Sequence, residues 1–186
     1  MISFKLCKDD RLSDIRKLKA EVSSISSELR EILSSDVFLC LRKQSRHCTT
    51  NTYDHCIRTA WISMMLADKW HMDRVSVAKA ALLHDFCDRW HATHIDVGRQ
   101  RGFYLYSHPI MAAKNAAHYF GITKEQRRAI LSHMFPTSIY PPVNRMAWIL
   151  IIADNTAAWH EFRYLQKESD PSVVRHYTIF RRGRVG

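Results

Sequence analysis

The sequence is poor in glycine and proline, with five of each among its 186 residues. Sandwiches and barrels of β-strands need many turns, so this scarcity argues against both and favours an all-α fold. No apolar run approaches the roughly 20 residues of a membrane span, and the first residues, MISFKLCKDDRL, lack the apolar stretch of a secretory signal. We therefore expect a cytoplasmic protein with no membrane segment.

Paired cysteine motifs are also absent. The five cysteines are odd in number, and no two stand in a CxxC arrangement. Reduced thiols that serve as small packing residues are the simplest interpretation.

Acidic residues are outnumbered, with 18 Asp and Glu against 28 Lys and Arg, for a formal net charge of +10. Such a surface favours anionic partners, which include nucleotides, other phosphate esters and nucleic acid, and the charge alone does not choose among them. Nucleic acid is a less favoured partner, because the sequence contains neither a zinc finger nor an RNA-binding signature.

Apolar residues recur with helical spacing along most of the chain. Residues 13–34 carry two seven-residue repeats, which predict one long amphipathic helix with Ser13 as its N-cap. This helix either packs along its own domain or forms the seam of a homodimer. Residues 87–106 read as irregular, rich in aromatic residues and histidine.

Capping residues delimit the helices that follow. We expect them at 53–70, from Asp73 to the segment AKAALLHDF, from His108-Pro109 to a stop at Gly121, from Thr123 to His133, and at 143–165. Thr123 with Gln126 resembles a capping box.

Six potential metal ligands are distributed over these helices. In chain order they are His55, His84, Asp85, His108, His133 and Asp154. Most gaps between them are roughly 20 to 30 residues, about one helix and a loop, so each group can come from a different helix of one bundle. His84-Asp85 and Asp154 end the apolar runs AKAALL and MAWILIIA, where a charge is costly to bury unless a metal or another partner neutralises it.

The order H…HD…H…H…D resembles the HD-domain superfamily of metal-dependent phosphohydrolases. The similarity covers about residues 50–165 and includes the segments YDHCIRTA, HDFCDRW, SHPIMAAKNA and SHMFPTSIYPP. It is strongest to the six-ligand, two-metal branch, which includes diadenosine tetraphosphate hydrolases. The resemblance implies an orthogonal helical bundle with an additional N-terminal amphipathic helix. We expect a helical extension at 1–48, the HD-type metal-binding domain at 49–168 and a basic tail at 169–186.

The resemblance also implies roles for the ligands. His55, His84, Asp85 and Asp154 would hold a first metal, and His108, His133 and a bridging Asp85 a second. Four imidazoles and two carboxylates suit one or two ions of Fe, Mn, Ni, Co or Zn better than Mg²⁺. A hydroxide activated by the metal would attack the phosphorus of a small substrate, which we expect to be a nucleotide.

Three arginines are the predicted phosphate contacts. Arg58 follows His55 on the same helical face, Arg89 stands where many family members carry a lysine after the His-Asp pair, and Arg145 precedes the helix of Asp154. With Asp85, Arg58 and Arg89 form the predicted catalytic set. Asp88, beside Arg89, departs from the family pattern. Its carboxylate would repel a phosphate group.

Three other functions are compatible with the sequence. An HD-fold di-iron oxygenase would use the same ligands, and a regulatory module would bind metal or nucleotide without catalysis. A nucleic-acid-binding protein would use the positive charge, and its binding would be sensitive to salt.

Overall fold

The computed structural model describes residues 10–46, 50–87 and 101–165, most of which are helical. The α-helices are α2 (Ile15–Ser24), α3 (Ser27–Ser34), α4 (Asp36–Leu39), α5 (Thr52–Lys69), α6 (Arg74–Leu83), α7 (Arg101–Phe120), α8 (Lys124–Ser132) and α9 (Arg145–His160). Shorter elements are η1 (Asp10–Ser13), η2 (Cys40–Lys43) and the π-helical turn η3 (Glu161–Leu165). Strands β1 (Ser45–Arg46) and β2 (Thr50–Asn51) form a small antiparallel pair. The predicted all-α class is confirmed.

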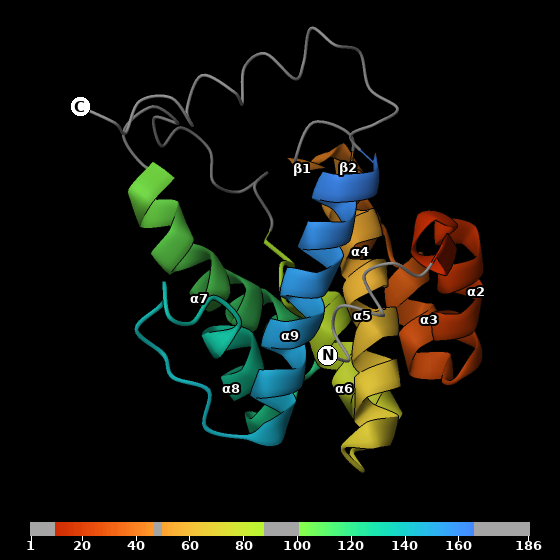
Figure 1. The fold of residues 1–186 in the computed structure, drawn as a ribbon. Helices are drawn as coiled ribbons and strands as arrows, with labels where there is room; N and C mark the ends of the chain where they lie inside the picture. Colours follow the sequence, from red (N-terminus) through yellow and green to blue (C-terminus); the bar gives the residue numbers. More distant parts are fainter. Residues whose placement is uncertain (1–9, 47–49, 88–100, 166–186) are drawn as a thin grey trace, which may run out of the picture.

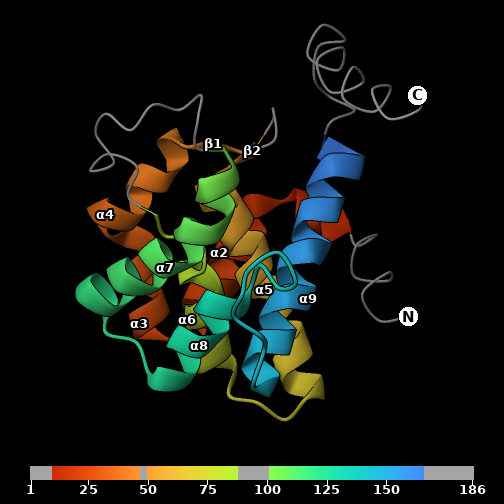
Figure 2. The ribbon, with the colours of Figure 1, turned by 90° about the vertical axis from the view of Figure 1, so that its left-hand side faces the viewer.

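Helix α5 lies at the centre of the bundle and packs against α6, α9 and α2 (Figure 1). Helices α2 and α3 lie on one side of α5 and α6, and α7 and α8 lie on the other side (Figure 1), which faces the viewer in Figure 2. Side chains from both sides join one hydrophobic core, whose largest fully buried members are Trp61, Tyr53, Phe38 and Phe86. The metal-ligand candidates on α5, α6, α7, α8 and α9 therefore converge from neighbouring helices.

The N-terminal region differs from the single helix expected over residues 13–34. The helix is interrupted between α2 and α3, where the Ser26 side chain accepts a hydrogen bond from Glu28 N at 3.1 Å. Serine competes for the backbone in this way and favours an N-cap over a helix interior. The prediction of one continuous helix is therefore wrong at Ile25-Ser26. The prediction of Ser13 as N-cap is wrong too, because Asp14 caps α2 and accepts from Lys17 N at 3.2 Å.

The apolar face of this region is used within the chain. Leu18, Val22, Leu29 and Ile32, which the predicted dimer seam would have used, are at most 2% exposed and belong to the common core. A homodimer formed through these residues would first have to unpack them. Residues 10–46, the described part of the extension predicted at 1–48, thus share a core with the helices of the metal-ligand candidates. The tail predicted at 169–186 lies outside the described residues.

The capping residues predicted for several helices are confirmed. Asp73 accepts from Ser76 N at 2.6 Å, and Thr123 and Gln126 form the reciprocal capping box. Gly121, with φ +55°, takes the left-handed conformation that ends α7. The helix expected at 143–165 begins at Arg145, with Asn144 as its N-cap, and continues into η3.

Helix α7 begins earlier than expected. It starts at Arg101 instead of His108, so Pro109 lies inside the helix, and part of the irregular segment predicted at 87–106 is helical. Proline removes one backbone hydrogen bond but does not by itself end a helix whose remaining residues pack well. Ala112, Ala113 and Ala116 of α7 are buried in the core and supply that packing.

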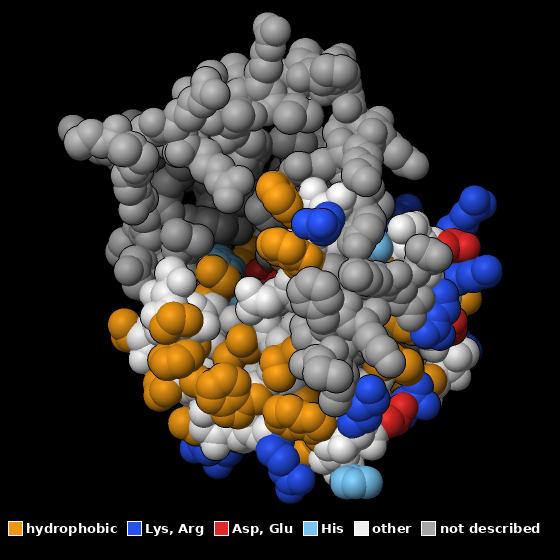
Figure 3. Space-filling view, viewed as in Figure 1, with side chains coloured by type: hydrophobic (Ala, Val, Ile, Leu, Met, Phe, Trp, Pro, Cys, Tyr) orange, Lys and Arg blue, Asp and Glu red, His pale blue; other side chains and the backbone are white. Residues whose placement is uncertain are grey.

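Apolar side chains are exposed on the face of the bundle drawn in Figure 3. Ile139, Val143 and Trp148 are among the exposed large apolar residues of the described chain. Within the described ranges, every helix is too short or too polar to cross a membrane.

Candidate metal centre

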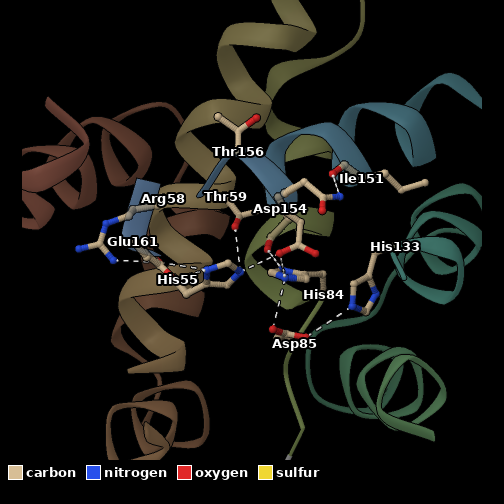
Figure 4. A network of polar contacts seen from close by, with 12 residues as sticks. His55, Arg58, Thr59, His84, Asp85, His133, Ile151, Asp154, Thr156 and Glu161 are labelled. Carbon is tan, nitrogen blue, oxygen red and sulfur yellow. Dashed lines mark hydrogen bonds and ion pairs between the residues drawn. The ribbon is translucent and has the colours of Figure 1, made fainter. Parts of the chain in front are cut away.

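The structure brings all six predicted ligands together in the interior of the bundle (Figure 4 shows five of them near one another). They come from five helices or helix ends. His55 lies in α5, His84 and Asp85 directly follow α6, His108 lies in α7, His133 directly follows α8, and Asp154 lies in α9. All six are buried, with exposed fractions of at most 7%.

The first half of the cluster lies between α5, α6 and α9. His55 Nε2 is 2.9 Å from Asp154 Oδ1, and His84 Nε2 is 3.6 Å from the same oxygen. His84 Nε2 also lies 3.4 Å from Asp85 Oδ2. Two imidazoles thus face two carboxylates at distances of 2.9 to 3.6 Å.

The second half of the cluster joins the ends of α6 and α8 to α7. His108 Nε2 and His133 Nε2 are 3.0 Å apart, and both lie near Asp85 Oδ1, at 3.6 and 3.5 Å. The two oxygens of Asp85 therefore face different halves, Oδ2 toward His84 and Oδ1 toward His108 and His133. This is the arrangement that a bridging carboxylate requires.

Hydrogen bonds behind the histidines orient their rings. His84 Nδ1 donates to Ala81 O and His133 Nδ1 donates to Ile130 O, both at 2.7 Å. On His55, Nδ1 faces the Glu161 carboxylate at 3.1 Å. A proton on Nδ1 leaves the lone pair on Nε2, so all three rings direct a metal-binding nitrogen into the cluster.

Burial keeps the imidazole of His84 neutral. It lowers the pKa of His84 from 6.5 to about 4, although Asp154 acts in the opposite direction. Burial also acts to raise the pKa of Asp154, but the contacts with His55 and His84 outweigh it and hold that pKa well below its usual value. A neutral imidazole and an ionised carboxylate are the forms that ligate a metal.

The donor set fits a divalent cation. His84 Nε2 is fully buried and makes no hydrogen bond within the described residues, an arrangement that is costly without a further partner. Nitrogen lone pairs and carboxylate oxygens that converge at these distances repel one another unless a proton or a cation lies between them. Three overlapping groups, each with ligand atoms within 4.8 Å of one another, could hold such ions.

A family comparison agrees with this geometry. The family model of the HD domain matches residues 52–159, which include all six ligands. The chain belongs to the HD-domain family. No curated protein and no solved structure matches it significantly. HD domains bind divalent metals, and in this HD domain the buried histidines and aspartates are groups that could hold such an ion.

Two of the three arginines predicted to contact phosphate make contacts away from the ligand cluster. Arg58 is 4% exposed and does not point to the ligand cluster, because its Nη1 bonds to Glu161 at 3.0 Å and its Nε to Leu12 O at 2.9 Å. Arg145 is exposed at the start of α9 and bonds to Trp70 O at 3.4 Å, away from Asp154. These contacts do not support the phosphate roles predicted for Arg58 and Arg145, which stay predictions. Arg89 lies outside the described residues.

Glu161 and Thr59 also contact His55, at Nδ1 and Nε2, and neither was predicted from the sequence. The Glu161 side chain is buried against His55 and Arg58 (Figure 4). Glu161 stands seven residues after Asp154, a spacing that places both on one face of a helix. The spacing does not identify the contacts of Glu161 with His55 and Arg58, which come from a helix distant in sequence.

Proposed function

We propose that this HD-domain protein is a metal-dependent phosphohydrolase for a small phosphorylated substrate, with nucleotides as the favoured class. The proposal combines the family, whose members are generally metal-dependent hydrolases, with the buried ligand cluster and the net charge of +10. A positive surface attracts phosphate esters and raises their rate of encounter with the protein.

The position of Asp85 carries this proposal. Its two oxygens face two separate sets of imidazoles, at 3.4 Å on one side and 3.5 to 3.6 Å on the other. Divalent ions bound in such a site would supply Lewis acidity, which activates water as a nucleophile and stabilises charge on a phosphoryl group. Among the candidates we favour Fe, Mn, Co, Ni or Zn, because the donor set is rich in imidazole.

The protein's own residues would orient the metal ions and keep bulk water away from them. His55, His84 and Asp154 form one wall of the site, His108 and His133 form the opposite wall, and Asp85 lies between them. The ligands are at most 7% exposed, so little bulk water reaches them. Acidic and histidine side chains are visible at the bottom of a hollow in Figure 3. Since Arg58 and Arg145 are engaged elsewhere, Arg89 is the remaining proposed phosphate contact.

The test begins with metal content and continues with turnover. Protein purified without added metal is analysed for Fe, Mn, Co, Ni and Zn per chain and then assayed for phosphate release from mononucleotides and dinucleoside polyphosphates. We expect bound transition metal and hydrolysis that chelation abolishes. Asp68→Asn, which alters an exposed ion pair with Arg74, is the control for charge removal.

Three results would replace the proposal. Bound metal without turnover on any substrate of the panel would favour a binding module. Oxygen consumption by iron-loaded protein would favour an oxygenase. Absence of metal, with no uptake on addition, would refute the metal-dependent function and direct attention to salt-sensitive binding of nucleic acid.

A further inference from the structure

We infer that Glu161 and Arg58 are positioning residues that orient His55 and strengthen metal binding in the half of the centre formed by His55, His84 and Asp154. The inference rests on the proposed metal-dependent function and adds an outer shell to it. It also connects the metal centre to the N-terminal region of the chain.

Glu161 holds His55 from behind. Both carboxylate oxygens lie 3.1 Å from His55 Nδ1, while Nε2 of the same ring lies 2.9 Å from Asp154. Glu161 is 1% exposed and His55 is fully buried, so water does not compete for this contact. The carboxylate therefore fixes the proton on Nδ1 and the plane of the ring, and it makes Nε2 a stronger donor to a metal.

Arg58 in turn holds Glu161. It lies three residues after His55 in α5, and its Nη1 reaches Glu161 Oε1 at 3.0 Å. The guanidinium balances the charge of this carboxylate, which is required because Asp154 already places a negative charge on the other side of the ring. The pair thus orients His55 without adding net charge to the buried centre.

The support extends to the N-terminal region. Arg58 Nε donates to the carbonyl of Leu12 in η1 at 2.9 Å, and the neighbouring Ser13 Oγ lies 3.4 Å from His160 Nε2. Leu12 is itself fully buried. A continuous series of contacts therefore runs from η1 through Arg58 and Glu161 to His55.

A purely structural role is the competing explanation, because the same ion pair also joins η3 to α5. Buried ion pairs contribute little net stability compared with apolar packing, so stability alone does not account for this one. The two explanations differ in a measurable way. A structural pair affects unfolding, whereas a positioning pair also affects metal affinity, and only while His55 is present.

The experiment measures the dissociation constant for Co²⁺ by titration of metal-free protein, with thermal unfolding recorded in parallel. We expect Glu161→Gln to weaken the tighter Co²⁺ site by about 10-fold or more, as changes behind a ligating histidine do. Arg58→Lys, which keeps the charge but loses the forked geometry, should weaken it by a few-fold and carries the test if Glu161→Gln does not fold. Glu28→Gln is the matched control, since Glu28 pairs with Lys79 on α6, and its Co²⁺ affinity should not change.

A double-mutant cycle completes the test. In a His55→Ala background, Glu161→Gln should have almost no further effect on Co²⁺ affinity, because the two residues act as one unit. Additive effects, or native affinity in a less stable Glu161→Gln protein, would overturn the inference and leave the proposed function intact. Failure of the unmodified protein to bind Co²⁺ would overturn both.

Discussion

The two halves of the candidate metal centre are supported in different ways. On the α5–α9 side, His84 is backed by the main-chain carbonyl of Ala81, but His55 is backed by the buried side chains of Glu161 and Arg58. On the other side, His133 is backed by the main-chain carbonyl of Ile130, one turn earlier in its own helix. One support depends on the packing of distant segments, and the other is local.

This difference predicts that the two halves bind a metal ion with different affinity. A charged partner raises the donor strength of a histidine more than a neutral carbonyl does, so the His55 half should bind its ion more tightly. The local carbonyl contact orients the ring without adding charge. We therefore expect two positions of unequal affinity that share Asp85.

The largest effect is expected from Asp85, because it belongs to both halves. Asp85→Asn keeps the shape of the side chain but removes the charge, so both positions should lose affinity. Changes of outer-shell partners alone cost 10- to 100-fold, so we expect turnover to fall by more than about 100-fold. Metal analysis and phosphate release measure the two effects. Turnover near that of the Asp68→Asn control would refute a bridging role.

A direct comparison of the halves uses His55→Ala and His133→Ala. Each variant should keep one ion, but the ion left in His133→Ala lies in the half backed by Glu161. Its affinity should exceed that of the ion left in His55→Ala by about 10-fold or more. Titration with Co²⁺ measures both constants. Equal affinities, or the reverse order, would show that the charged support does not create the asymmetry.

The sequence indicates the six candidate ligands better than the residues that lie behind them. Their order and spacing, and the apolar runs before His84-Asp85 and Asp154, can be seen along the chain without the structure. Arg58 was read as a phosphate contact, since its spacing from His55 shows a shared helical face but not the direction of the side chain. Its partners Leu12 and Glu161 are far away in sequence, and no local pattern predicts that they meet.

The same contrast applies to the fold. Capping at Asp73, Thr123 and Gly121 was predictable because a cap depends on neighbouring residues. The early start of α7 at Arg101 was not, since the packing of its later turns outweighs the local effect of Pro109. Helix ends set by local chemistry follow from sequence, and those set by packing require the structure.

A smaller effect, on stability, is expected from the loss of a hydrogen bond to the main chain just after Asp85. Gln44 Nε2 donates to Cys87 O at 2.8 Å, just after Asp85, and Cys87 Sγ contacts His108 O at 3.2 Å. Gln44→Met should lower the free energy of unfolding of the metal-free protein by about 1 kcal/mol, the usual contribution of one such bond. Denaturation in urea measures it, with the exposed Lys17→Met as control. A Gln44→Met change no larger than that of Lys17→Met would show that this contact does not hold the turn.

The smallest effect is expected at Arg145, which belongs to neither half. It lies nine residues before Asp154 in α9, roughly 13 Å along the helix axis, and its side chain is exposed. Arg145→Ala should change kcat/KM by less than about 2-fold. It should leave the free energy of unfolding equal or higher by up to about 0.5 kcal/mol, because a cation at a helix N-terminus opposes the helix dipole. A fall of 10-fold or more in kcat/KM would mean that the substrate extends to the start of α9, and the residues that contact its far end would then have to be sought there, beyond both halves of the metal centre.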